Sequence, residues 1–275
     1  MKKKLFCEIS PFTFWISLQK EIGLRHLKNL LGKERFAHRY KKERLPVVVS
    51  SQVSHMIKVG LGIDPQLQRN KADNIRLACS KMDGLIIAPG ETFSFWNRVG
   101  KTSRRNGFSE GRVLVNGQLV AGVGGGLCNL ANTINLLVLH SPLTITELHH
   151  HSDALAPDPG GKHVPYGAGT SVNYNFIDYR FRNDTAQPVQ LCLWCEGSDL
   201  HAELRTVKDY PYTYRLTEED HHFHRESNGK FYRLSKIYRE TLNRTTGETV
   251  RKELTWDNRS EVLFDAGLIP ESQIR

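Results

Sequence analysis

The sequence lacks the features of a membrane-spanning or exported chain. No stretch approaches the roughly 20 consecutive apolar residues that a helix needs to cross a bilayer. Lys2 to Lys4 resemble the start of a signal peptide, but the following stretch from Leu5 to Leu18 is interrupted by Glu8 and Pro11, and no small-residue cleavage site follows it. We therefore expect a cytoplasmic protein.

Cysteine is scarce, and phosphate-binding glycine patterns are missing. Five cysteines are an odd number without a dense framework, which favours free thiols in a reducing compartment. Cys192 and Cys195 have the spacing of a redox or zinc pair, but residues three apart in a strand point to opposite faces. The glycine run at 122–126 is not followed by Lys-Ser or Lys-Thr. We therefore expect neither a redox or zinc pair here nor a phosphate loop.

Positive charge is concentrated at one end of the chain. The net charge is +9, and residues 1–44 hold twelve Lys or Arg against four Glu. Such an arm suits an anionic membrane surface or a wall precursor, whereas nucleic acid is not favoured. Leu24, Leu27 and Leu31 form one stripe of a basic helix, which either lies on a membrane or packs on the body. Membrane attachment through residues 1–44 would make the protein peripheral at the inner membrane face.

Hydrophobic periodicity predicts an α+β fold with a mixed, mainly antiparallel sheet and helices concentrated in the N-terminal half. Helices are expected over 10–40, over 70–81 and from Cys128 to the stop at Ser141-Pro142. Strands are expected at 46–49, 85–87, 92–96, 112–115, 119–120, 143–151, 189–195, 200–204, 231–242 and 248–256. The sequence does not indicate an oligomeric state.

Three shorter segments carry specific expectations. Asn116-Gly117 between apolar runs predicts a hairpin turn. Ser171 to Arg182 is predicted as one long strand with a bulge near Phe176, because its apolar alternation slips by one residue there. The histidine-rich segment 220–224 is interpreted as a loop.

The segment Gly124-Gly125-Gly126-Leu127-Cys128 is the strongest chemical candidate. Consecutive glycines let the backbone approach a bound group, and a helix N-terminus presents free N–H groups and positive potential. A thiol at that position is expected to have a lowered pKa, which would activate it as a nucleophile. The alternative is a tight crossover in which Cys128 is a small buried residue.

A catalytic triad is one hypothesis for this thiol. Cys128 on a helix, His151 at a strand end and Asp178 on the next strand follow the order of papain-like, transglutaminase-like and cell-wall-peptidase thiol enzymes. His151 would be the base and Asp178 would orient it. For the third position, the alternatives are Asp153, Asp158 and Asn173.

The histidines at 149–151 also suggest a metal. Strand alternation puts His149 and His151 on one face, and Cys128 or Asp153 would complete a zinc site. Histidine-rich surface turns are common, however. No metal or cofactor is therefore assigned, and His149 is kept as a candidate ligand-binding residue.

Several spaced motifs resemble those of the VanW family. They are Pro89 to Trp96, Val115-Asn116-Gly117, Gly124 to Cys128, His151-Ser152 and Val164 to Gly167. The resemblance covers roughly residues 74–205 and implies cell-envelope biology linked to peptidoglycan and glycopeptide resistance, which is an antibiotic response. It supplies no reaction.

The chain departs from the family pattern at two positions. Asn129 stands where the family usually has Gln, and Gly169 stands where many members carry an acid. Asn129 keeps an amide that could assist an oxyanion hole, but its reach is shorter. A triad in this chain would need its acid elsewhere.

These observations predict a basic helical N-terminal region (1–73), a VanW-like core (74–205) and a β-rich C-terminal extension (206–275). One hypothesis is a thiol-dependent hydrolase or transferase that acts on a wall-precursor amide. The other is a non-enzymatic binding or accessory module for peptidoglycan-related ligands, with its cleft formed by the glycine loop and Phe93 to Trp96. The predicted ligand-binding residues are Gly124, Gly125, Gly126, Asn129 and His149.

Overall fold

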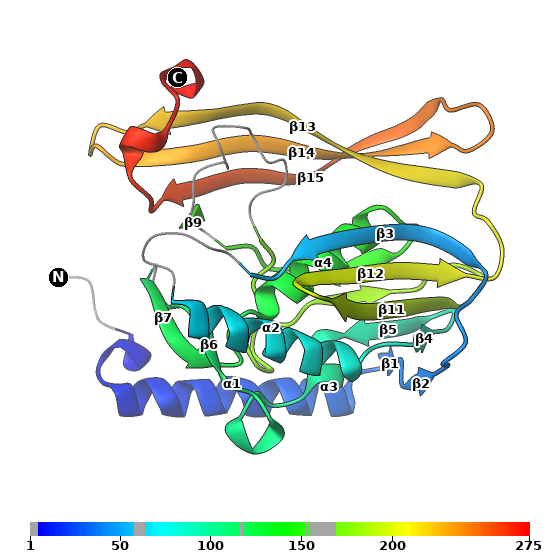
Figure 1. The fold of residues 1–275 in the computed structure, drawn as a ribbon, viewed down its shortest axis with the longest axis horizontal. Helices are drawn as coiled ribbons and strands as arrows, with labels where there is room; N and C mark the ends of the chain where they lie inside the picture. The colour runs from blue at the N-terminus through cyan, green and yellow to red at the C-terminus, as the bar shows by residue number, and fades with distance from the viewer. Residues whose placement is uncertain (1–4, 58–63, 116–117, 152, 155–168) are drawn as a thin grey trace.

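The computed structural model describes residues 5–57, 64–115, 118–151, 153–154 and 169–275 (Figure 1). Within these residues the α-helices are α1 (Pro11–Leu31), α2 (Pro65–Ser80), α3 (Phe95–Val99) and α4 (Leu127–Leu139), and the 3-10 turn η1 (Phe6–Glu8) precedes α1. The strands pair mainly antiparallel, and the last of them ends at Val262. The predicted α+β class, with its helices in the first half, is confirmed.

A five-stranded antiparallel sheet forms the centre of the molecule. Its order is β2 (Arg39–Tyr40), β4 (Leu85–Ile87), β11 (Val189–Glu196), β12 (Asp199–Thr206) and β3 (Val47–His55). The predicted hairpin of 189–195 with 200–204 is confirmed as β11–β12. Helices α2 and α4 contact this sheet and each other, so their apolar faces are buried in the core.

A second sheet adjoins the first. Its order is β1 (Arg35–Phe36), β5 (Glu91–Ser94), β10 (Arg180–Arg182) and β8 (Thr144–Glu147), with β1 parallel to β5. The rings of Phe93 and Phe181 stack with centroids 4.7 Å apart, and both are fully buried. Strands β1 to β3, from the predicted N-terminal region, thus pair with strands of the predicted core.

The predicted strand over 171–182 is wrong for residues 171–179. Asn173 and Ile177 exchange backbone hydrogen bonds of 2.9 and 3.0 Å across a tight turn, and only Arg180–Arg182 forms a strand. Asn175 occupies the left-handed region with φ 44°, which asparagine tolerates better than most residues. The slip in alternation near Phe176 was therefore the signature of a turn.

Strands β6 (Glu110–Val115) and β7 (Gln118–Val123) pair as a hairpin, as expected. The predicted turn at Asn116-Gly117 lies outside the described residues, as do Ser152, Asp158 and the motif at Val164 to Gly167.

A separate sheet occupies the C-terminal part. It comprises β13 (Tyr212–Arg225), β14 (Phe231–Asn243), β15 (Thr249–Val262) and the short parallel strand β9 (Asp153–Ala154). The predicted pairing of 231–242 with 248–256 is confirmed. The loop predicted at 220–224 is wrong, because β13 continues through it past a bulge where Asp220 adopts φ 54°.

Arg239 on β14 fastens this sheet to α4. Its guanidinium donates hydrogen bonds to the carbonyl oxygens of Leu139, at 2.9 Å, and Ser141, and it lies 4.2 Å from the ring centroid of Tyr214. A cation at the C-terminal end of a helix satisfies carbonyl groups that have no partner within the helix. The two parts are therefore held together by a specific polar contact.

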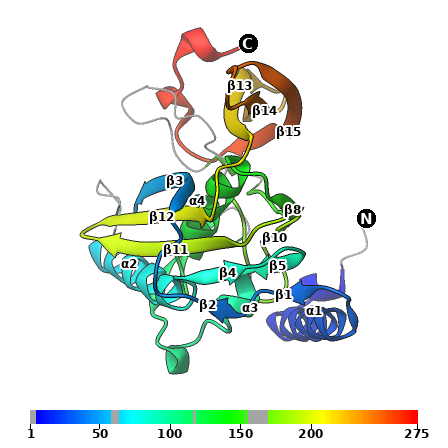
Figure 2. The same ribbon diagram turned by 90° about the vertical axis from the view of Figure 1, so that its right-hand side faces the viewer.

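Both views place the sheet of β13–β15 and helix α1 on opposite sides of the core (Figures 1 and 2). Helix α4 lies between that sheet and the five-stranded sheet, so it reaches from the glycine turn to the junction of the two parts. Of the helices described, none is both long and apolar enough to cross a bilayer.

Candidate functional site

The glycine turn before α4 is shaped by close packing of the backbone. Gly124 and Gly126 adopt φ 83° and 102°, in the region that favours glycine. A Cβ on Gly125 would lie 2.3 Å from the carbonyl carbon of Gly111 in β6. The space beside Gly125, predicted to receive a ligand, is thus filled by the neighbouring strand.

Cys128 is the second residue of α4, as the sequence predicted for a thiol at a helix N-terminus. Its thiol is a hydrogen-bond donor to the carbonyl oxygen of Val172, with 3.8 Å between sulfur and oxygen. Burial raises the pKa of the Cys128 thiol, contrary to the expected lowering. The cost of burying a thiolate here outweighs the attraction of the helix N-terminus.

The segment with the histidines pairs with residues 169–171. The His151 N–H donates to Gly169 O at 3.1 Å, and the Ser171 N–H donates to His149 O at 2.7 Å. His150 lies opposite Thr170, whose hydroxyl is 3.4 Å from the amide oxygen of Asn132 on α4.

Residues opposite each other in an antiparallel pair share a face. Because Thr170 contacts α4, the side chain of His150 also lies on the side that faces α4. His149 instead lies with its Nε2 3.2 Å from a carboxylate oxygen of Glu147.

Asp178 is fully buried and serves the local backbone and one arginine. Its carboxylate accepts hydrogen bonds from Ser94 Oγ (2.6 Å), the N–H groups of Trp96 (3.1 Å) and Tyr179 (2.9 Å), and Arg180 Nε (2.8 Å). No histidine is among these partners. In the described part of the chain, the predicted thiol, imidazole and carboxylate are thus not joined by hydrogen bonds, and their catalytic roles stay predictions.

The remaining predicted residues have structural partners. The side-chain amide of Asn129 lies 3.2 Å from the Ser54 hydroxyl on β3, and no contact with the Cys128 thiol is described. Among the residues that the structure describes, no group of three or more His, Cys, Asp or Glu side chains is arranged to hold a metal ion. The side chain of Asp153, the alternative acid and metal ligand, lies outside the description.

The predicted aromatic cleft does not exist. Phe93 and Phe95 are fully buried, Trp96 is 5% exposed, and the Trp96 indole N–H donates to Ile177 O at 2.8 Å. These rings belong to the hydrophobic core. The expectation that they line a ligand site is therefore wrong.

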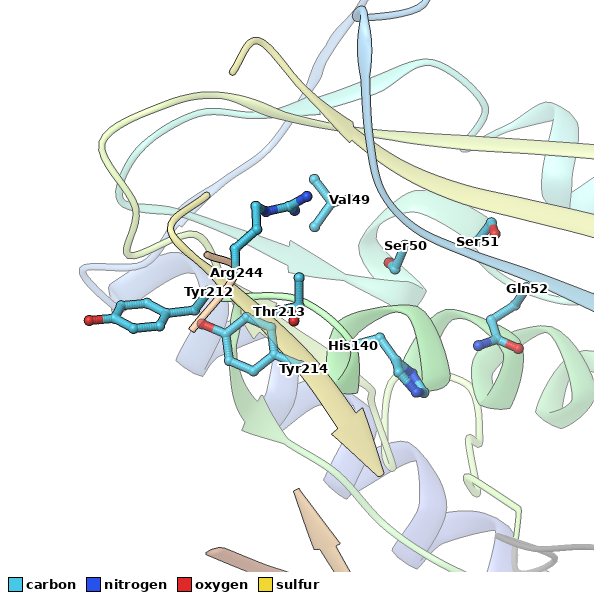
Figure 3. A pocket seen from close by; sticks show the side chains of 9 residues that line it. All are labelled: Val49, Ser50, Ser51, Gln52, His140, Tyr212, Thr213, Tyr214 and Arg244. Carbon is cyan, nitrogen blue, oxygen red and sulfur yellow. The ribbon is translucent and has the colours of Figure 1, made fainter. Parts of the chain in front are cut away.

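A polar cavity of about 190 Å³ opens where α4 ends, between β3 and β13; we call it the junction cavity (Figure 3). Its lining residues are Val49, Ser50, Ser51, Gln52, His140, Tyr212, Thr213, Tyr214 and Arg244. In Figure 3 the Arg244 side chain extends toward Val49, while His140 lies at the end of α4 beneath β3.

The junction cavity offers polar groups that are available to a ligand. Within the described part of the chain, the Gln52 amide and the hydroxyls of Tyr212 and Tyr214 make no hydrogen bond to protein. Arg244 lies with Nη1 3.2 Å from a carboxylate oxygen of Asp209, and the lining itself contains no carboxylate. Such a surface suits amide, hydroxyl and carboxylate groups.

A smaller cavity of about 30 Å³ lies midway along α4. Two buried polar atoms there, Asn135 Oδ1 and His150 Nδ1, have no hydrogen-bond partner, and the imidazole stacks on Trp256 with centroids 4.0 Å apart. Burial, with repulsion from the neighbouring histidines, lowers the pKa of His150 to about 4. This volume exceeds the roughly 10–15 Å³ that one water molecule needs, so the cavity has room for a water-sized group.

Sequence reasoning missed the junction cavity. It is built from β3 and β13, which are distant in sequence and approach each other only because the C-terminal sheet docks on α4. One local signal was present: Tyr212 and Tyr214 share a face of a strand by alternation.

The chain is similar to known proteins over most of its length. A family model described as "VanW like protein" matches residues 70–205. The chain is 28% identical over 237 residues to the Vancomycin B-type resistance protein VanW of Enterococcus faecalis, an alignment that covers 86% of this chain and 84% of that protein.

It is also 31% identical over 121 residues to the uncharacterized protein YoaR of Bacillus subtilis, covering 44% of this chain and 38% of that protein. No solved structure matches the chain.

Proposed function

Since the chain belongs to the VanW family, we propose that it acts in the response to glycopeptides as a binding or accessory module, whose junction cavity takes up the end of a wall-derived peptide. The observation that carries this proposal is the Gln52 amide in that cavity, which makes no hydrogen bond to protein within the described part of the chain, together with the Arg244 guanidinium. The role of the relative in vancomycin resistance, which its name states, suggests the cell-wall setting.

The state of Cys128 favours binding over covalent catalysis. Its thiol is hydrogen-bonded to the Val172 carbonyl, and burial raises its pKa. A raised pKa keeps the thiol protonated at neutral pH, whereas the nucleophile in thiol enzymes is the thiolate. The carboxylate of Asp178, the proposed orienting acid, accepts hydrogen bonds from Ser94, Trp96 and Arg180 instead. It thereby links β5, β10 and the start of α3.

The chemistry of the junction cavity indicates the class of ligand. Gln52 supplies an amide that both donates and accepts, and the lining residues Ser50, Ser51 and Thr213 also carry hydroxyls. Arg244 adds a guanidinium, a group that recognises carboxylates. The terminal residue of a peptide carries an amide and a carboxylate, which such groups can bind.

The size of the junction cavity limits what enters it. Its volume of about 190 Å³ is below the 300–1,000 Å³ typical of sites for whole drug-sized ligands. We therefore expect it to hold one terminal residue or sugar ring, with the rest of the ligand outside.

Calorimetric titration with soluble muropeptides, released from peptidoglycan by a muramidase, tests this proposal. Gln52→Ala should weaken binding roughly tenfold, since it removes from a partly buried site the amide that would pair with the ligand. Val53→Ala is the matched control, because the next residue on β3 is 61% exposed and does not line the cavity. Absence of binding by the unaltered chain, or equal loss in both variants, would contradict the proposal.

A thiol-dependent hydrolase or transferase remains the second candidate. It is favoured by the position of Cys128 in the first turn of α4, next to the segment that pairs with the histidine segment. This candidate predicts that incubation with muropeptides cleaves or exchanges an amide bond, which mass spectrometry detects. It also predicts that Cys128→Ala abolishes that change with folding intact.

A further inference from the structure

Helix α1 is attached to the core by its polar stripe. Arg25 donates two hydrogen bonds to the Glu147 carboxylate, at 2.5 and 2.7 Å, and the Asn29 side-chain oxygen accepts one from Arg180 at 2.8 Å. No residue of α1 is fully buried. The helix is thus held through ion pairs and hydrogen bonds.

The opposite stripe is apolar and faces outward. Among the described residues, eleven of the twenty-two exposed large hydrophobic side chains lie between residues 5 and 31. We call this set the outward face: Leu5, Phe6, Ile9, Phe12, Phe14, Trp15, Ile16, Leu24, Leu27, Leu30 and Leu31. Phe12 is 67% exposed and Leu30 is 80% exposed. The sequence allowed Leu24, Leu27 and Leu31 either to lie on a membrane or to pack on the body of the protein. All three face away from the body.

Basic residues accompany the outward face. Lys20, Lys28 and Lys33 are exposed along or just after α1, and the sequence adds Lys2 to Lys4 immediately before it. Residues 1–44 carry twelve Lys or Arg against four Glu. An exposed apolar surface of this kind marks an interaction site, and the surrounding charge selects an anionic partner.

We propose that η1 and α1 form an anchor that lies along the surface of an anionic lipid bilayer. Interfacial helices bury an apolar face at the boundary between headgroups and acyl chains, while lysines contact anionic headgroups. Trp15 suits that boundary, because an indole is apolar with one polar N–H. A second copy of the chain fits less well, since pairing two outward faces would bring two strongly basic segments together.

The anchor fixes how the molecule stands on the membrane. The outward face has members at both ends of the helix, over 5–16 and over 24–31, and the polar stripe is tied to the core, so α1 lies parallel to the bilayer plane. The sheet of β13–β15 is on the far side of the core (Figures 1 and 2). Peripheral attachment through α1 therefore leaves that sheet directed away from the lipid.

Flotation of the full chain with vesicles tests the anchor. We expect binding to phosphatidylcholine vesicles that contain phosphatidylglycerol, and weaker binding to phosphatidylcholine alone or in high salt. The double variant Phe12→Ser/Trp15→Ser should lose roughly tenfold or more in partition, because two aromatic side chains leave the interface. The matched control is Val250→Ser/Leu254→Ser, two residues that are 55% and 50% exposed on β15, and it should bind like the unaltered chain.

Fluorescence tests whether Trp15 enters the interface. Vesicles should shift the tryptophan emission to shorter wavelength, and Trp15→Phe should abolish this shift while binding persists. Equal partition of the two double variants would overturn the proposal. So would vesicle-free self-association, measured by sedimentation, that Phe12→Ser/Trp15→Ser removes, because the outward face would then be an interface between copies.

Discussion

The thiol of Cys128 is hydrogen-bonded to the carbonyl oxygen of Val172, 3.8 Å away, in the first turn of α4. This contact joins the most conspicuous motif of the sequence to the segment that precedes the turn at 173–177. The thiol is also buried at this contact, and burial raises its pKa, which keeps it protonated.

Thiol reactivity should follow burial and pairing. Interaction with the Cys79 thiol lowers the pKa of Cys195 to about 7, whereas burial raises the pKa of Cys192 to about 11 and also raises that of Cys128. Iodoacetamide at pH 7.5 should therefore alkylate Cys195 before Cys128 and Cys192, as peptide mass spectrometry would record.

Removing the Cys79 thiol provides the control for this order of alkylation. Cys79→Ala should slow alkylation of Cys195, and Cys192→Ser should leave it unchanged. Fastest labelling at Cys128 would contradict our account of that thiol.

Asp178→Ala should destabilise the fold. The change removes the buried carboxylate that accepts from Arg180 Nε at 2.8 Å and from Ser94 and Trp96, and Arg180 keeps hydrogen-bond partners only at the α1 side. We therefore expect a loss of about 3 kcal/mol in the free energy of unfolding in urea. Asp184→Ala, which breaks the exposed pair with Arg182, should cost less than about 1 kcal/mol. Equal, small effects would instead favour a functional role for Asp178.

Arg239→Ala should loosen the C-terminal sheet from α4. It removes two charge-assisted hydrogen bonds to the end of the helix and the contact with Tyr214, for an expected loss of about 2–3 kcal/mol. Arg251→Ala provides the comparison, since this exposed arginine also pairs with Glu253. Hydrogen exchange along β13 should rise only in the first variant, and unchanged exchange there would argue against the tether.

Stability should fall with acidification because of His150. Its pKa is lowered to about 4 in the folded protein, against an ordinary value of 6.5 that applies when the chain unfolds. Between these values the unfolded state binds more protons, so stability is fully present above pH 6.5 and declines as pH falls toward 4. After discounting for partial exposure, we expect a loss of about 1–2 kcal/mol.

A variant that cannot titrate isolates this effect. His150→Phe retains a ring against Trp256 and should flatten the pH profile of the unfolding free energy between pH 4 and 6.5. His26→Gln, at an exposed position on α1, should leave the profile as it is. An unflattened profile in His150→Phe would assign the acid sensitivity to other groups.

The sequence predicted the elements whose pattern is local. The apolar stripe of α4, the hairpin of β11 and β12 and the pairing of β14 with β15 follow from periodicity and turn residues, and all are present. The predicted strand over 171–182 failed because a turn at 173–177, with Asn175 in the left-handed region, shifts the apolar alternation by one residue, as a bulge would.

The site was harder to predict because it depends on burial and on distant contacts. The thiol was correctly assigned to a helix N-terminus, yet the direction of its pKa shift depends on the packing of Val172 and its neighbours. Gln52 and Tyr214 belong to separate sheets and carry no motif. In the same way, a helical pattern shows that α1 has an apolar stripe, and only Arg25 and its partner Glu147 reveal which side faces the core.

Binding of a soluble muropeptide to the Cys128→Ala variant, measured by calorimetry beside the unaltered chain and Gln52→Ala, tests the central claim most directly. The account predicts that Cys128→Ala binds within about a factor of two of the unaltered chain, that Gln52→Ala binds roughly tenfold more weakly, and that the muropeptide keeps its mass throughout. Loss of binding in Cys128→Ala, or cleavage of the muropeptide by the unaltered chain alone, would contradict it.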